Sequence, residues 1–205
     1  MHLVCDFDNT LFDTTTLWNA WLDVLVSAGI DREEAIAKVE VVIIQGFTLR
    51  AHAERLGLGG KELERAVKQS EVFTNEQAPS LVYQDVIPFF DKHKPAHSFS
   101  LLTYGDSDYQ HFKVHAANLQ DYFEAIRIAG PHKLKVSHLS EMLKHTEIPL
   151  AFVDDSPNEL EPVYRAGLPV KLFRISRPEG RHTDRSHALD GVAWTCIQSI
   201  DEIPL

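Results

Sequence analysis

Cysteine is scarce in this chain, and so are basic residues and long apolar runs. Cys5 and Cys196 are the two cysteines among 205 residues, too few for a disulfide framework, which fits a reducing compartment. Acidic residues outnumber basic ones by 30 to 20, and the formal net charge is −10. This balance argues against a general nucleic-acid-binding protein, whose surface would be basic. One local positive site is still enough to bind a small anion.

No apolar run approaches the roughly 20 residues that a membrane-spanning helix needs. The longest one, at residues 39–44, is interrupted by Glu40. The first apolar strand begins almost at Met1, which leaves no room for a signal peptide. We therefore expect a cytoplasmic protein with no membrane partner.

Helical spacing of apolar residues dominates the stretch from residue 14 to residue 75. Four helical patterns follow one another there, and no convincing strand interrupts them. Gly29, Gly46 and Gly57 end the first three patterns. The length of the chain allows one large domain or a core domain with a smaller insertion, so we expect a compact helical insertion here.

From residue 80 onward, short apolar strands alternate with helical patterns. We expect strands at residues 98–103, 125–129, 149–153 and 170–173, and helices at residues 82–90, 108–118, 137–145 and 158–166. Strands that alternate with helices predict right-handed crossovers and a parallel sheet.

Two carboxylates, Asp6 and Asp8, stand two residues apart directly after the first apolar run. Side chains at this spacing face the same side of a strand. Like charges held this close are unfavourable unless a cation lies between them or one carries a proton. An ordinary turn also favours Asp. A helix–loop–helix calcium loop is excluded, because Leu11 and Leu17 stand where it needs Gly and Glu.

Two further predicted strands end on polar groups. Thr103 closes one of them, and Asp154 and Asp155 directly follow another. In a doubly wound sheet the functional site lies outside the carboxyl ends of the strands. Three strand ends that carry such groups favour one shared site over three unrelated turns.

These motifs, in this order, resemble those of the haloacid dehalogenase superfamily of aspartate-nucleophile phosphohydrolases. The matching elements are the run from Asp6 to Thr10, Thr103 with Gln110 and Lys113, a lysine before a helix, and Asp154–Asp155 with Glu159. The resemblance covers residues 1–173. It implies an α/β fold, a doubly wound parallel Rossmann-like sheet at residues 1–13 and 80–205, with an α-helical cap inserted at residues 14–79. In that family the cap closes over the site and determines substrate specificity.

The resemblance also implies roles for the residues at the strand ends. Asp6 resembles the nucleophile that attacks phosphorus and forms an aspartyl-phosphate, and Asp8 resembles the general acid/base. Thr103 would donate a hydrogen bond to a phosphoryl oxygen, with a helix-capping hydroxyl as the alternative. The presence of Asp8 favours phosphoryl transfer over carbon–halogen cleavage, because dehalogenases of the family lack this second aspartate.

The implied cofactor is Mg²⁺, which prefers oxygen ligands in an octahedral arrangement. It would screen the negative charge of the substrate from the negative charge of the nucleophile. The expected ligands are the carboxylates of Asp6 and Asp154 and the backbone carbonyl of Asp8. Asp155 would bind the metal directly or hold a metal-bound water.

A lysine should stand before the helix that follows the third strand, and Lys133 and Lys135 both qualify. Lys135 is preferred if Ser137 is the N-cap of that helix, and the other lysine is then a surface charge. His111 and His115 have a spacing that binds zinc, but no Cys or Glu completes the set, so an ordinary helix face is the better interpretation.

Two other groups have a structural and a functional interpretation. Trp18 and Trp21 would pack in a helical core or line a substrate pocket. The stretch from Arg174 to His187 is typical of a solvated loop, although it could also lean over the site toward an acidic substrate. Its remaining arginine and histidine members are Arg177, Arg181, His182 and Arg185.

We therefore expect a Mg²⁺-dependent phosphohydrolase whose partner is a small phosphorylated metabolite. Two alternatives stay open: a sugar phosphomutase with the same core residues, and a non-catalytic binding or regulatory protein on the same core. The presence of all the motif residues disfavours the second alternative. The sequence specifies neither the substrate nor the oligomeric state.

Overall fold

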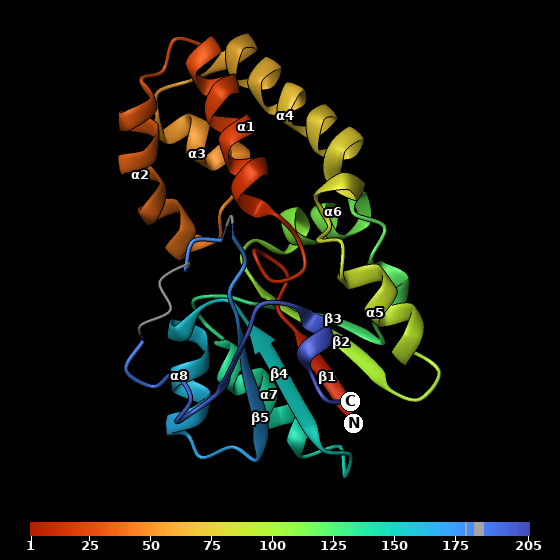
Figure 1. The fold of residues 1–205 in the computed structure, drawn as a ribbon. Coiled ribbons are helices and arrows are strands. Elements are labelled where there is room, and N and C mark those ends of the chain that lie inside the picture. Colours follow the sequence, from red (N-terminus) through yellow and green to blue (C-terminus); the bar gives the residue numbers. More distant parts are fainter. Residues whose placement is uncertain (179, 183–186) are drawn as a thin grey trace.

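The computed structural model describes residues 1–178, 180–182 and 187–205, so Arg185 of the charged loop lies outside the described residues. A sheet of six parallel strands forms its centre, in the order β3-β2-β1-β4-β5-β6 (Figure 1). The expected α/β fold with a doubly wound parallel sheet is confirmed. The strands are β1 (His2–Cys5), β2 (Ser98–Tyr104), β3 (Ala125–Ala129), β4 (Leu150–Asp154), β5 (Val170–Ile175) and β6 (Thr195–Ile197).

The central strands are buried on both faces, which is why they appear in the sequence as nearly continuous apolar runs. Along β1, Leu3 and Cys5 join the buried apolar cluster on one face, and Val4 joins the cluster on the other. Helices cover both faces. They are α5 (Val86–His93), α6 (Ser107–Ala116), α7 (Lys135–Leu143) and α8 (Pro157–Arg165), with short 3₁₀ turns η1 (Gln120–Tyr122) and η2 (Ile200–Glu202).

Four helices lie together beyond the carboxyl ends of the strands (Figure 1). We call them the four-helix unit: α1 (Thr14–Ser27), α2 (Arg32–Gln45), α3 (Leu49–Arg55) and α4 (Gly60–Leu81). The unit has its own buried apolar cluster, which includes Trp21, Leu25 and Leu63. The Asp13 side chain caps α1 by accepting a hydrogen bond from the backbone N–H of Thr16, an interaction that stabilises a helix by about 1 kcal/mol. None of the described helices has the length and apolarity that crossing a membrane requires.

Several predicted boundaries were wrong. Helix α5 begins at Val86 rather than at residue 82, because Val82 pairs with Phe12 in a short antiparallel bridge. Pro88 consequently stands in the first turn of α5, where its missing N–H costs nothing. Helix α7 begins at Lys135, not at Ser137. Strand β6 was not expected from the sequence, since it has three residues of which two are exposed.

Candidate active site

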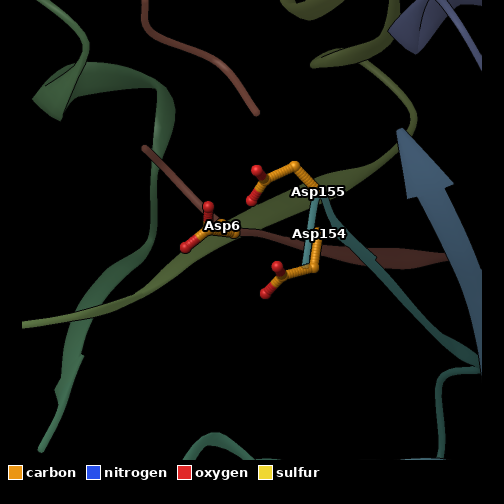
Figure 2. A group of neighbouring side chains, drawn as sticks. All are labelled: Asp6, Asp154 and Asp155. Atoms are coloured by element: carbon orange, nitrogen blue, oxygen red, sulfur yellow. The ribbon is translucent and has the colours of Figure 1, made fainter. Parts of the chain in front are cut away.

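The three strand-end carboxylates meet at one point. Strands β1 and β4 are neighbours, with Cys5 beside Val153, so Asp6 emerges next to Asp154 and Asp155. One oxygen from each of the three carboxylates lies within 4.8 Å of the others. Figure 2 shows the three side chains converging from two adjacent strand ends. All three are buried.

A buried lysine completes this cluster. Lys135, the first residue of α7, places Nζ 2.6 Å from Oδ1 of Asp6 and 2.7 Å from Oδ2 of Asp154. Lys133 instead forms an exposed ion pair with Glu141 at 2.7 Å. Of the two candidate lysines, the structure places Lys135 in the site and Lys133 outside it.

The cluster carries more negative than positive charge. Burial, together with the charges of Asp154 and Asp8, raises the pKa of Asp6 to about 7 although Lys135 acts in the opposite direction. Burial and the charges of Asp154 and Asp6 raise the pKa of Asp155 well above its usual value. A cation held among these oxygens would stabilise the ionised forms of both Asp6 and Asp155. A set of carboxylates fits a hard cation such as Mg²⁺. The residues present therefore fit the implied metal.

The Asp8 carboxylate is held apart from this cluster. Its oxygens accept hydrogen bonds from Nζ of Lys113, from Oγ1 of Thr14 and from Nε2 of Gln110. Burial alone would raise the pKa of Asp8, but the charge of Lys113 and these hydrogen bonds hold it below its usual value. Lys113 and Gln110 were part of the sequence motif, but their spacing did not indicate that both would contact Asp8.

Thr103 lies near the end of β2, fully buried, and lines the same cavity. Its Oγ1 has no hydrogen-bond partner within the part of the chain that the structure describes. Buried hydroxyl groups are normally satisfied, and a phosphoryl oxygen would satisfy this one. The alternative role as a helix cap is wrong, because the Asp106 side chain caps α6 by accepting from the N–H of Tyr109.

The charged loop contributes structural and cavity-lining residues. Arg177 is buried and donates from Nε and Nη2 to the carbonyl oxygen of Thr10, at 3.0 and 2.9 Å. The hydroxyl of Thr10 accepts in turn from the backbone N–H of Asp155 at 3.0 Å. Arg174 is buried against Asp190, so a wholly solvated loop is wrong for these two arginines.

A cavity of about 530 Å³ opens above the carboxylates. Arg181 and His182 line it, as the alternative interpretation of the charged loop predicted. Trp18 and Trp21 line it as well, although Trp21 is also buried in the core of the four-helix unit. The cavity therefore joins the strand ends to the four-helix unit.

The zinc interpretation of His111 and His115, which the sequence disfavoured, has no support among the described residues. Nδ1 of His111 lies 2.8 Å from the backbone oxygen of Ser107, one turn earlier on α6. Across the described residues, Asp6, Asp154 and Asp155 form the one group of three side chains close enough to share a metal ion.

Several solved structures share this fold. No family model matches the sequence, and no curated protein shows significant similarity to it. A haloacid dehalogenase-like hydrolase from Burkholderia xenovorans has a TM-score of 0.72 at 16% identity, covering 97% of this chain and 92% of its own. A predicted phosphoglycolate phosphatase from Haemophilus somnus has a TM-score of 0.60 at 14% identity, covering 95% and 92%.

A third similar structure is that of the HAD-hydrolase YfnB from Bacillus subtilis, solved bound to magnesium. Its TM-score is 0.57 at 12% identity, covering 85% of this chain and 87% of its own. At these identities the similarity is one of fold. The chain has the fold of the haloacid dehalogenase-like hydrolases, as its motifs predicted.

Proposed function

We propose that this protein is a Mg²⁺-dependent phosphohydrolase that cleaves a small phosphomonoester through an aspartyl-phosphate on Asp6. The observation that carries the proposal is the cluster of Asp6, Asp154 and Asp155 around one point, with Lys135 beside it and the unpartnered Thr103 hydroxyl in the same cavity. The comparison structures add support, since one is described as a phosphatase and another binds magnesium.

Each residue of the site has its own role in the proposed reaction. Asp6 attacks phosphorus, and the leaving alcohol departs as the bond from Asp6 to phosphorus forms. Lys135 and Thr103 bind phosphoryl oxygens, so charge that develops there meets donors already in place. Mg²⁺, held by Asp6, Asp154 and Asp155, would supply the charge screening that lets an anionic nucleophile approach an anionic substrate.

Asp8 is proposed as the general acid/base: in its protonated form it gives a proton to the leaving alcohol oxygen, and the resulting carboxylate then accepts a proton from the attacking water. Water hydrolyses the acyl phosphate, gives a proton to Asp8, and returns Asp6 to its carboxylate form. The contacts from Lys113, Thr14 and Gln110 favour the ionised form of Asp8, which is the form that accepts a proton from water. The same contacts fix the direction in which the carboxylate points.

Release of inorganic phosphate tests the proposal directly. The purified protein is incubated with 4-nitrophenyl phosphate and acetyl phosphate, with MgCl₂ or with EDTA. We expect release with MgCl₂, loss of release with EDTA, and at least about a hundredfold lower kcat for Asp6→Asn. Release of free phosphate from sugar phosphates also distinguishes hydrolysis from transfer of the phosphoryl group to a second sugar.

Asp121→Asn is the matched control, because it makes the same chemical change at an exposed position in η1. This variant should keep the activity of the unmodified protein. Equal phosphate release by unmodified protein and Asp6→Asn, or no release from any phosphomonoester with MgCl₂, would overturn the proposal.

A further inference from the structure

The cavity has two chemically different ends. Near the strand ends it is lined by carboxylates, Lys135 and Thr103. Its other end is lined by the four-helix unit and the segment between α2 and α3, through the apolar side chains of Trp18, Ile36, Val39, Ile43 and Phe47. The phosphoryl group belongs at the first end, so the organic part of a bound substrate extends toward the second.

Three apolar side chains of α2, those of Ile36, Val39 and Ile43, are not part of the buried core of the four-helix unit. Of the α2 side chains, Ala35 belongs to that core, and Val42 is buried as well. Ile36, Val39 and Ile43 recur at spacings of three and four residues along a second stripe of the same helix. This second stripe lines the cavity, and Ile36 keeps 48% of its surface exposed. Exposed apolar surface of this kind inside a cavity is typical of a ligand site.

Several polar atoms along this wall already have partners within the protein. Nε1 of Trp21 donates to Nδ1 of His52 at 3.0 Å. The hydroxyl of Tyr104 donates to the backbone oxygen of Ile44 at 3.0 Å, and Oγ1 of Thr15 donates to Asn9. The indole N–H of Trp21 and the hydroxyl protons of Tyr104 and Thr15 are thus not free to donate to the hydroxyl groups of a sugar, and a hydroxyl buried without a partner is unfavourable.

One charged side chain stands on this wall. Among the described residues that line the cavity, Glu40 is the single charged group that the four-helix unit supplies. Its negative charge disfavours a second carboxylate or phosphate on the substrate close to α2. A phosphorylated acid is therefore poorly matched to this wall; Arg181 and His182, which also line the cavity, lie outside the four-helix unit.

We propose that the substrate is the phosphomonoester of an apolar alcohol, with an aromatic or branched aliphatic group that packs against Trp18, Ile43 and Phe47. This inference rests on the proposed function and adds the substrate class. The cavity of about 530 Å³ falls within the range of roughly 300–1,000 Å³ that small-molecule sites occupy, so it holds such a group together with the phosphate.

The test compares 2-phenylethyl phosphate with glycerol 3-phosphate and glucose 6-phosphate. All three carry the phosphate on a primary alcohol, so the apolar group is the main difference. We expect kcat/KM for 2-phenylethyl phosphate to be higher by about tenfold or more, the effect that apolar contacts in a specificity pocket supply. An equal or higher kcat/KM for either polar substrate would overturn the inference and leave the proposed hydrolysis intact.

Two neighbouring residues of α2 provide a matched pair of variants. Ile43 lines the cavity, whereas Ile44 is 64% exposed and does not. Ile43→Ser should lower kcat/KM by about tenfold for 2-phenylethyl phosphate and by a smaller factor for glycerol 3-phosphate. Ile44→Ser should change neither. Equal effects of the two substitutions would contradict the assignment of this wall.

Binding gives a second readout that does not require turnover. Calorimetry with MgCl₂ present compares 2-phenylethylphosphonate with 2-hydroxyethylphosphonate, both of which resist hydrolysis. Tighter binding of the phenyl compound, weakened by Ile43→Ser, supports an apolar site even if no phosphomonoester is hydrolysed. Equal binding of the two compounds overturns the inference. Absence of phosphate release from every substrate instead counts against the proposed function.

Discussion

Nζ of Lys135 lies 2.6 Å from Oδ1 of Asp6, so a buried cation contacts the carboxylate that we propose as the nucleophile. The same ammonium group lies 2.7 Å from Oδ2 of Asp154. One positive charge thus offsets part of the charge of three buried carboxylates. Lys135 therefore stabilises the folded site in addition to its proposed contact with phosphate.

Replacement of Lys135 by Met should lower the free energy of unfolding by about 3 kcal/mol in the absence of divalent cations, because it leaves buried carboxylates without a partner. Urea denaturation in EDTA measures this loss. Added MgCl₂ should restore part of the stability, since a bound cation replaces the missing positive charge.

Lys133→Met is the control for that experiment. Its ammonium group pairs with Glu141 at the surface, and exposed pairs contribute at most about 1 kcal/mol. Equal destabilisation by the two substitutions would show that Lys135 has no special electrostatic role in the folded site.

Lys133 and Lys135 show how much of the candidate site can be predicted from the sequence. They stand two residues apart before a predicted helix, and side chains at that spacing do not share a helix face. The decision between them therefore depends on where the helix begins. The sequence predicts a start at Ser137, whereas the helix begins at Lys135. The two starts differ by a few backbone hydrogen bonds that the sequence pattern does not specify.

Contacts between segments far apart in the sequence were still harder to predict. Lys113 and Asp8 are separated by 105 residues in sequence, and only the parallel order of β1 and β2 brings α6 over the first strand end. The apolar stripe of Ile36, Val39 and Ile43 was visible as a helix pattern. The sequence did not show that these three side chains lie outside the core of the four-helix unit, to which α2 contributes Ala35.

Arg177→Lys should reduce kcat by about tenfold and lower the free energy of unfolding by about 2 kcal/mol. The planar guanidinium donates twice to the carbonyl oxygen of Thr10 and once to Asp85 at 2.8 Å. A lysine cannot make this set of contacts. Because Thr10 also accepts from the N–H of Asp155, loosening it displaces a proposed metal-site residue.

Phosphate-release kinetics and urea denaturation check both effects. Arg165→Lys serves as the control, since Arg165 is exposed and pairs with Glu161 within α8. A fall in stability with unchanged kcat would mean that Arg177 supports the fold without positioning the site.

Gly46→Ala should impair the contact between the four-helix unit and the sheet. Gly46 has φ +94°, and a Cβ there would lie 3.2 Å from the backbone nitrogen of Asp106. We expect a loss of about 1 kcal/mol from the left-handed backbone. We also expect a several-fold higher KM, because the end of α2 is pushed away from the cavity.

Gly29→Ala separates these two effects. Gly29 has a similar φ of +88°, but a Cβ added there would meet no atom within 4 Å. This variant should lose comparable stability and keep the KM of the unmodified protein. An unchanged KM in both variants would show that the approach of α2 to the loop after β2 does not shape the substrate cavity.

Acid should destabilise the four-helix unit through His52. This side chain is fully buried, and Nδ1 accepts a hydrogen bond from Nε1 of Trp21. An indole N–H only donates, so the ring proton is on Nε2, which donates to the carbonyl oxygen of Ala35 at 2.9 Å. Protonation would place a second hydrogen on Nδ1 and break the contact with Trp21. Burial accordingly lowers the pKa of His52 below its usual 6.5.

The direction of the pH effect follows from that shift. Below pH 6.5 the unfolded chain binds a proton at His52 that the folded chain does not bind. The free energy of unfolding therefore falls as the pH falls. The slope from one such proton is at most about 1.4 kcal/mol per pH unit. Urea denaturation between about pH 7.5 and pH 5.5 measures it. His52→Gln, which can accept and donate but does not titrate, should flatten the profile, whereas His145→Gln at an exposed position should not. If the profile of His52→Gln matches that of the unmodified protein, another group controls the acid sensitivity.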